Sequence, residues 1–264
     1  MYTYIDIYAM KMSLYALLIF FLTFQPCIVT SAPRYVPIED VALDCGSPVD
    51  QLAHDKRRWV GDNNKDDRFA LIEEESNRKS TSLRALSQAS SVESVPYLTA
   101  RISRSEFTYS FRVSVPGPKF VRLHFYPARY EQDFDVRGSF FAVKAGPYTL
   151  LKNFSASLFA TYKDRPAFAK EFCINVKENQ TTIDLTFAPA SSSSYAFVNG
   201  IEVVSMPKTL YYAPADDPSK SPSFIRQKGN SPFGSYSDSA LETLYRLNIG
   251  GRAISPMEDT GMYR

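Results

Sequence analysis

The side chains that could do chemistry gather first in an acidic run. Glu131, Asp133 and Asp135 occupy alternate positions, so an extended strand would present all three carboxylates on one face. Paired carboxylates perform glycoside hydrolysis, but no second acidic cluster opposes this one, and a solvated acidic edge is the favoured interpretation. As a calcium loop beginning at Asp133, the run has Gly138 at the required sixth position but Lys144 where the bidentate acid belongs. The run therefore predicts neither a glycosidase nor a calcium site.

The two histidines, His54 and His124, suggest no metal site and no nucleophile–base pair, so we expect no catalytic residue, no metal and no cofactor. Carbohydrate binding is a more specific hypothesis than catalysis for this sequence. Sugar rings, in contrast, stack on aromatic faces and accept hydrogen bonds from planar polar groups. The candidate carbohydrate-binding residues are Tyr97, Arg101, Arg122, Tyr126 and Tyr130. The alternative is that the tyrosines belong to the core or to an ordinary surface.

The elements that must position these residues are strands. Apolar and polar residues alternate over residues 107–115, and they alternate again over 120–126, after the Pro-Gly-Pro at 116–118. A period of two fits an extended strand with one wet face, and proline and glycine favour a tight turn. The sequence therefore predicts a β-hairpin with Phe111 and Leu123 on its buried face.

The pattern stays extended beyond this hairpin. Short strands are predicted over residues 139–144, 147–151, 168–176, 182–187 and 195–205. No convincing amphipathic helix separates them. Many short strands at this spacing are typical of a two-sheet antiparallel sandwich of the jelly-roll kind, so the predicted fold class is all-β.

Residues 1–31 are typical of a secretory signal peptide. Lys11 precedes an apolar run over residues 14–24, and the run is shorter than the ~20 apolar residues that span a bilayer. Residues 29–31 offer a cleavage site before Ala32. We expect a secreted, extracellular chain, with a signal anchor or a buried strand as the alternatives.

Export has consequences for asparagine and cysteine. Asn153 and Asn179 each begin an Asn-x-Ser/Thr triplet beside turn-like sequence, so we expect both to be N-glycosylated. Cys45 and Cys173 could form a disulfide in an oxidising compartment. The favoured interpretation is that Cys45 is a small buried hydrophobic residue instead.

A short internal repeat divides the chain. Residues 43–47 and 247–251 share the pattern Leu-Asx-x-Gly-small, which predicts that a second copy of the domain begins near residue 244. Residues 207–239 are rich in Pro, Ser, Lys, Asp and Gly, as linkers are. We expect a domain over 36–206, a linker over 207–243, and the first strand of a truncated second copy over 244–264.

Several segments have a distinctive sequence. They are LDCG at 43–46, RW at 58–59, PYLTAR at 96–101, FTY at 107–109, FVRLHFYP at 120–127, GPYTLLKNFS at 146–155, AFVNGIEV at 196–203 and YRLNIGG at 245–251. Together they resemble the ectodomain of the FERONIA-type plant receptor-like kinases over roughly residues 36–264.

The resemblance implies a malectin-like domain that binds ligands outside the cell, joined in the full-length receptor to a membrane helix and a cytoplasmic serine/threonine kinase. The implied partners are a secreted signalling peptide, a membrane-anchored co-receptor and cell-wall pectin or another polysaccharide, at the plasma membrane. Peptide recognition in this family depends largely on the second malectin-like domain. Four serines at 191–194 stand where animal malectin has an acidic sugar-binding residue, so that residue is not matched. The alternative is a free secreted lectin-like protein or decoy.

The charge pattern bears on the choice of partner. The 264 residues include 30 Lys and Arg and 28 Asp and Glu, and this net charge of +2 argues against nucleic acid. Pectin is a polyanion, so local cations suffice for weak, salt-sensitive binding. The predicted cations are Lys56, Arg57, Arg58, Arg101, Arg122 and Arg129. Arg122 and His124 fall on the predicted wet face, so we expect their replacement to cost far less stability than replacement of Phe111 or Leu123, unless they belong to a binding surface.

Overall fold

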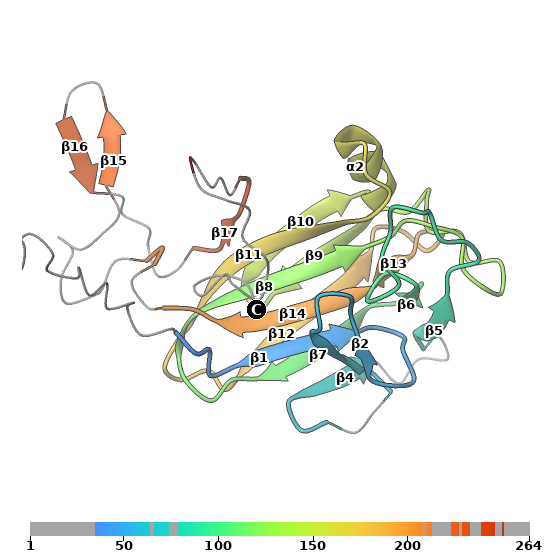
Figure 1. Ribbon diagram of the computed structural model, residues 1–264, viewed down its shortest axis with the longest axis horizontal. Helices are drawn as coiled ribbons and strands as arrows, with labels where there is room; N and C mark the ends of the chain where they lie inside the picture. The colour runs from blue at the N-terminus through green and yellow to red at the C-terminus, as the bar shows by residue number, and fades with distance from the viewer. Residues whose placement is uncertain are drawn as a thin grey trace, which may run out of the picture. The chain divides into compact units, whose positions relative to one another are not determined.

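The computed structural model shows a β-sandwich with one short helix in the described part of the chain (Figure 1). The described residues are 35–63, 66–73, 79–207, 210–212, 223–226, 229–232, 239–245 and 250. The predicted signal peptide lies outside this part of the chain, as do nearly all of residues 246–264. The all-β fold class is confirmed.

One sheet has seven strands, in the order β17-β11-β8-β14-β1-β3-β2. Their bounds are Leu241–Glu242 for β17, Phe168–Val176 for β11, Gly117–Phe125 for β8, Gly200–Ser205 for β14, Asp40–Asp44 for β1, Arg58–Gly61 for β3 and Gln51–Leu52 for β2. β8 lies in the interior of the sheet and is antiparallel to both of its neighbours, whereas β1 and β3 are parallel to each other. The sheet joins the first strand of the domain, β1, to its last, β14.

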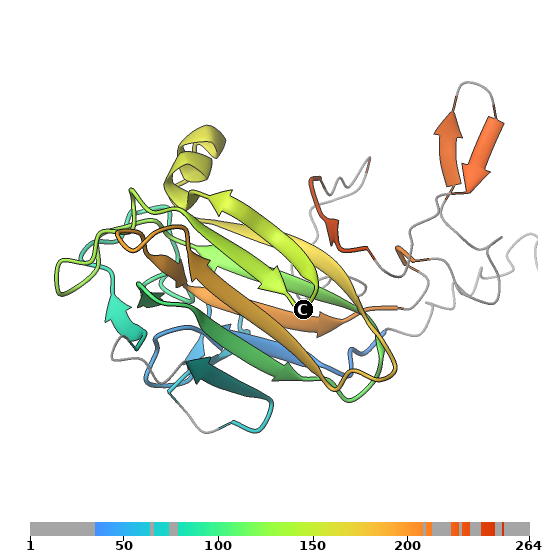
Figure 2. The ribbon, with the colours of Figure 1, turned by 180° about the vertical axis from the view of Figure 1, so that it is seen from behind.

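The second sheet has five strands, in the order β10-β9-β12-β7-β4, and Figure 2 shows it from the side opposite to Figure 1. Their bounds are Tyr148–Phe154 for β10, Phe141–Ala145 for β9, Thr182–Pro189 for β12, Phe107–Arg112 for β7 and Phe69–Glu73 for β4. A three-stranded sheet follows the order β13-β6-β5, with bounds Ala196–Val198, Thr99–Ser103 and Thr81–Arg84. A separate hairpin pairs β15, Ser223–Arg226, with β16, Gly229–Pro232.

The core lies between the apolar faces of the two large sheets. Phe111 of β7 and Leu123 of β8 are both fully buried, which confirms the predicted apolar faces. Phe107 of β7 stacks on Phe187 of β12, with ring centroids 5.1 Å apart. Large aromatic side chains bury much apolar surface each, so this interior stabilises the sandwich strongly.

The predicted hairpin over residues 107–126 is wrong. β7 pairs with β4 and β12, and β8 pairs with β11 and β14, so the two strands belong to different sheets. The connection between them therefore passes from one layer of the sandwich to the other. Both arrangements bury Phe111 and Leu123, because each strand turns the same side chains toward the core. Alternation identifies the buried face but not the strand's partner.

One helix, α2 at Ala156–Lys163, lies at one end of the sandwich, beyond β10 (Figure 1). Ser155 is its N-cap, and the Ser155 hydroxyl accepts a hydrogen bond from the backbone N–H of Leu158. Asp164 ends the helix in the left-handed region, at φ 51°. Only Ala156 and Ala160 of the helix are buried, so its sequence lacks the periodic apolar stripe from which an amphipathic helix is predicted.

Candidate functional site

The three candidate tyrosines surround one buried asparagine. Asn199, fully buried between β13 and β14, accepts a hydrogen bond from the backbone N–H of Tyr126. Its amide donates to the backbone carbonyl of Tyr97 at 2.9 Å and to the hydroxyl of Tyr130 at 2.8 Å. Tyr130 is 0% exposed and Tyr126 is 6% exposed. Tyr126 and Tyr130 therefore present little ring surface to solvent and Tyr97 is partly buried, and a sugar-stacking role for the three tyrosines stays a prediction.

Arg122 lies between two glutamates on the outer face of the seven-stranded sheet. Its guanidinium donates to Glu171 of β11 at 2.7 Å and to Glu202 of β14 at 3.0 Å. Glu202 also pairs with Arg57 at 2.6 Å and with His124 at 2.7 Å. All of these side chains are nearly inaccessible, with Arg122 itself 9% exposed. The expectation of a wet face at Arg122 and His124 is wrong, because loops from elsewhere in the chain cover this side of the sheet.

The protonation states in this cluster follow from burial and pairing. Burial alone would raise the pKa of Glu202, but the positive charge of Arg122 and the hydrogen bond from His124 outweigh it and lower the pKa. Burial also lowers the pKa of His124, despite its bond to Glu202. A neutral His124 therefore donates from Nε2 to Glu202 and accepts at Nδ1 from the Tyr97 hydroxyl, 3.0 Å away. Among the described residues the cluster is an internally paired network, in which Nη2 of Arg57 is the one buried side-chain nitrogen without a hydrogen-bond partner.

Arg101 belongs to a second buried cluster of hydrogen-bonded polar side chains. The guanidinium of Arg101 pairs with Asp62 at 2.9 Å and donates to Asn63 at 3.0 Å, and its side chain is 8% exposed. The hydroxyl of Tyr109 donates to the same Asp62 carboxylate. Arg57, Arg101 and Arg122 therefore contribute little to a surface field, which corrects the set of cations predicted for pectin.

The cysteines are free and buried in different places. Cys45 belongs to the main core, whereas Cys173 packs with Phe120, Val204 and Met206 on the outer face of the seven-stranded sheet. The possible Cys45–Cys173 disulfide is therefore wrong for this structure. Burial raises the pKa of the Cys173 thiol to about 12, so it stays protonated.

The two sequons lie at exposed positions. Asn153 is exposed near the end of β10 at φ 46°, and Asn179 is exposed in the turn between β11 and β12. Glycosylation at both asparagines stays a prediction.

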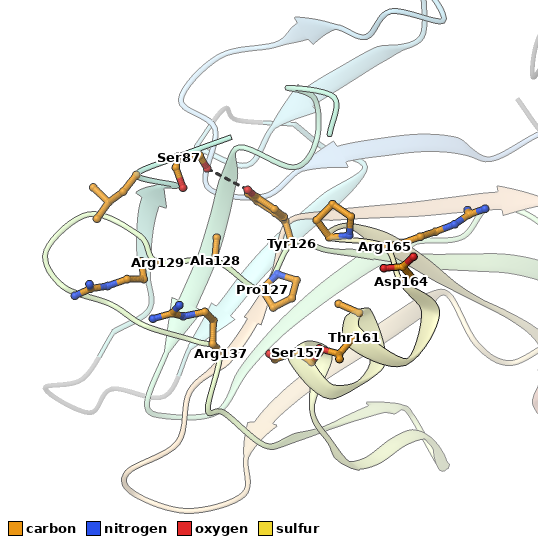
Figure 3. Close-up of a pocket in the computed structure, with 13 residues that line it drawn as sticks. Ser87, Tyr126, Pro127, Ala128, Arg129, Arg137, Ser157, Thr161, Asp164 and Arg165 are labelled. Carbon is orange, nitrogen blue, oxygen red and sulfur yellow. Dashed lines mark hydrogen bonds between the residues drawn. The ribbon is translucent and has the colours of Figure 1, made fainter. Parts of the chain in front are cut away.

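A hollow of about 660 Å³ lies beside α2 (Figure 3). We call it the Tyr126 hollow, because Tyr126, just past the end of β8, is the one candidate carbohydrate-binding residue in its wall. The Tyr126 hydroxyl is held by the backbone carbonyl of Ser87 at 3.2 Å. The lining residues are Leu86, Ser87, Tyr126, Pro127, Ala128, Arg129, Arg137, Ser157, Ala160, Thr161, Asp164, Arg165 and Pro166.

The lining of the Tyr126 hollow is positively charged. Arg129 and Arg137 lie on one flank, and Arg165 lies on the other beside Asp164 (Figure 3). Arg137 pairs with Asp135 at 2.6 Å, and Arg129 lies 3.9 Å from Asp133, but both arginines stay about half exposed. Asp135 already accepts from both Nε and Nη2 of Arg137, so Arg129 and Arg165 are the less engaged cations of the lining. Guanidinium groups bind carboxylates in a bidentate manner. The hollow is therefore suited to an acidic ligand.

Of the residues around the Tyr126 hollow, Arg129 and Tyr126 were predicted from the sequence as binding residues. Arg137, Arg165 and the helix α2 were not. Arg165 follows the helix directly, so its place in the wall depends on a helix that has no strong pattern. The N-capping Ser155, three residues before the amide it accepts from, is the one sequence signal for that helix.

The described residues offer no site for a metal ion and no membrane-spanning helix. No group of three or more His, Cys, Asp or Glu is arranged there to hold a metal ion. Among the same residues, no helix has the length and apolar character needed to cross a bilayer.

Comparison with known proteins identifies relatives across nearly the whole chain. The model of the malectin-like domain family matches residues 43–264. The receptor-like protein kinase FERONIA of Arabidopsis thaliana is 43% identical over 253 residues, which cover 94% of this chain and 26% of that protein. The chain thus spans about a quarter of the length of the curated relatives it matches.

Solved structures match as well. A chain in the crystal structure of plant peptide RALF23 in complex with FER and LLG2 matches with a TM-score of 0.67 at 42% identity, over 87% of this chain and 53% of that one. The ANXUR1 extracellular domain from Arabidopsis thaliana matches with a TM-score of 0.69 at 27% identity, over 85% of this chain and 55% of that one.

Proposed function

The chain belongs to the malectin-like domain family, and from this we propose that it is the extracellular ligand-binding part of a receptor-like serine/threonine kinase. The observation that carries the proposal is the 43% identity to a receptor-like kinase over 94% of this chain. The part of the chain matched by the family contributes binding, whereas kinase activity would belong to another part of a full-length receptor at the plasma membrane.

The proposed organisation keeps the boundaries predicted from the sequence. A signal peptide over 1–31 directs export, a malectin-like domain occupies 36–206, a linker follows over 207–243, and a second malectin-like domain starts over 244–264. In support, the strands of the sandwich from β1, which begins at Asp40, to β14, which ends at Ser205, fall within the proposed first domain; the two-residue strand β17 adds to the sheet edge from within the proposed linker.

Two classes of ligand are proposed. The first is a secreted signalling peptide held together with a membrane-anchored co-receptor, which the complex of RALF23 with FER and LLG2 supports by similarity. The second is an acidic cell-wall polysaccharide such as pectin. The Tyr126 hollow supports this second ligand, because three arginines and only one aspartate line it.

Pectin binding has a direct test in the purified chain. We expect weak binding to de-esterified pectin that falls as salt rises, because exposed charges are screened beyond about 10 Å at 0.1 M salt. The double variant Arg129→Gln with Arg137→Gln should weaken binding. Arg112→Gln is the matched control, since Arg112 is an exposed arginine of β7 outside the hollow. Affinity unchanged by salt, or lost equally in the control, would overturn this site.

A free secreted lectin-like protein or decoy is the second candidate function. It would use the same hollow without passing a signal across the membrane. Sequencing the transcript beyond codon 264 discriminates the two, because a receptor continues into a second sandwich, an apolar span and a kinase domain.

A further inference from the structure

The helix α2 separates two hollows. Ser157, Ala160 and Thr161 line the Tyr126 hollow, whereas Phe159, Tyr162 and Lys163 line a second hollow of about 600 Å³. These two sets alternate along the helix with the spacing of opposite faces. We call the second one the Tyr245 hollow. Its remaining lining residues are Arg165, Phe168, Ala169, Lys170, Glu242, Thr243, Leu244 and Tyr245.

The Tyr245 hollow has the exposed aromatic rings that the predicted sugar platform lacks. The side chains of Tyr162 and Tyr245 are each 79% exposed, and Leu244 is 71% exposed. Phe159 provides a further ring deeper in the wall. Large apolar side chains gathered at one exposed hollow are typical of a binding surface, because isolated folded domains usually bury them.

Cations accompany these rings. Lys163 lies over the rings of Tyr162 and Phe159, at 5.4 and 5.7 Å from their centroids. Lys170 lies 4.6 Å above the Phe159 ring and also pairs with Glu242. In the described part of the chain, neither Lys163 nor Arg165 forms an ion pair. The second hollow thus offers two unpaired positive charges beside exposed rings.

Arg165 connects the two sites, because it lines both hollows at the C-terminal end of α2. We propose that one acidic polysaccharide chain occupies both the Tyr126 and the Tyr245 hollows, as a single track that passes the C-terminal end of α2, where both hollows share Arg165. The inference rests on the proposed polysaccharide function and extends it from one hollow to two.

The chemistry of the track favours a polyuronide over an acidic peptide. Uronic acid residues carry a carboxylate on every ring, which matches cations repeated along both hollows. Their apolar ring faces also stack on exposed tyrosines, and their hydroxyls bond to groups such as Ser157 and Thr161. An acidic peptide would use the cations alone.

Chain length is the measurable signature of a two-hollow track. We expect a galacturonate trimer to occupy one hollow and a dodecamer to reach both at once. Such two-site engagement raises affinity well beyond that of either site. We therefore expect the wild-type chain to bind the dodecamer at least about tenfold more tightly than the trimer, by calorimetry at low salt.

Two variants test whether both hollows contribute. One carries Arg129→Gln and Arg137→Gln, and the other carries Tyr162→Ala and Lys163→Gln. Each should lose most of the dodecamer advantage while still binding the trimer at its unaltered hollow. These side chains are exposed, so equal melting temperatures check that folding is retained. Arg112→Gln again serves as the matched control.

The possible outcomes distinguish failure of the two-hollow track from failure of the proposed polysaccharide binding. If the second variant binds the dodecamer as wild type does, the track is wrong and polysaccharide binding at the Tyr126 hollow stands. If no galacturonate binds the wild type, polysaccharide binding fails and the track fails with it. Poly-glutamate of matched charge should bind clearly more weakly than the dodecamer, and equal affinity would overturn the carbohydrate assignment in favour of an acidic peptide.

Discussion

Asp44 is a carboxylic acid held inside the protein near neutral pH. Its side chain accepts hydrogen bonds from Thr99 at 2.7 Å and from Gln51 at 3.1 Å, and it is 1% exposed. Burial, together with the nearby charge of Asp62, raises the pKa of Asp44 from its ordinary 3.8 to about 7. Between these values the folded chain keeps a proton that the unfolded chain has released. The free energy of unfolding must therefore fall as pH rises through this window.

Replacing Asp44 with asparagine should remove this fall. The amide oxygen still accepts a bond from Thr99, but the side chain no longer titrates. Denaturant unfolding of both proteins at several pH values between about 4 and 7.5 measures the effect. Asp66→Asn is the control, because the hydrogen bond from Arg68 lowers the pKa of Asp66 and moves its titration below the window. Parallel curves for wild type and Asp44→Asn would contradict the prediction.

Replacing Arg122 should lower the free energy of unfolding far more than replacing an arginine on a solvent-exposed face would. Arg122→Gln leaves the carboxylates of Glu171 and Glu202 buried with less compensating charge, which costs about 3–5 kcal/mol for a broken buried pair. Arg58→Gln, which breaks the pair with Asp50 at a 75% exposed arginine, should cost about 1 kcal/mol or less. Urea unfolding of the two variants measures the contrast, and similar losses would show that the Arg122 network contributes little.

At the scale of single elements, α2 depends on its cap. Ser155→Ala removes the acceptor for the Leu158 amide and should destabilise the chain by about 0.5–2 kcal/mol. The same change deletes the sequon at Asn153, so Asn153→Gln is the matched control that keeps the cap and deletes only the sequon. The free energies of unfolding of wild type, Ser155→Ala and Asn153→Gln, all expressed in a host that glycosylates secreted proteins, are then compared. A loss of stability in Asn153→Gln equal to that in Ser155→Ala would assign the effect to the sequon instead of the cap.

The strands could be predicted from the sequence far better than their partners. β11, at Phe168–Val176, matches its predicted bounds, and the buried face of β7 was predicted correctly. The outer face of β8 was not, because Tyr97 bonds to His124 of β8 while Arg57 and Thr243 bond to glutamates of the two neighbouring strands, and all three residues are remote in sequence from β8. Alternation records which face is apolar, and it carries no information on which distant loop covers the polar one.

The candidate site was predicted incompletely for the same reason: the sequence does not show which distant residues come together. Tyrosine and arginine are the residue types of both a sugar site and an internal network, so composition could not separate Arg101 in the interior from Arg137 at the surface. The exposed rings at Tyr162 and Tyr245 come together only through α2 and the segment after the linker, and neither element has a periodic pattern strong enough to predict.

At the scale of the whole molecule, peptide binding should depend on more than this chain. The chain covers 53% of the matched chain in the RALF23 complex, and stable recognition usually takes about 800 Å² from each partner. We expect this chain to bind a secreted peptide of the RALF type much more weakly than a longer protein that includes a complete second malectin-like domain. Surface plasmon resonance with both proteins against one peptide measures the difference, and equal affinities would place the peptide site within the first domain.

The pairing of β1 with β14 sets an order of events during synthesis. The strand at Asp40–Asp44 finds its antiparallel partner only at Gly200–Ser205, so the central sheet cannot close until residue 205 has been made. Contacts this distant in sequence make folding slow. Both sequons precede residue 205, and the Ser155 hydroxyl that completes one of them is buried as the helix cap once the domain has folded. For a chain exported and glycosylated as predicted, the late closure would leave a period in which Asn153 and Ser155 are accessible in an open chain, before the cap forms.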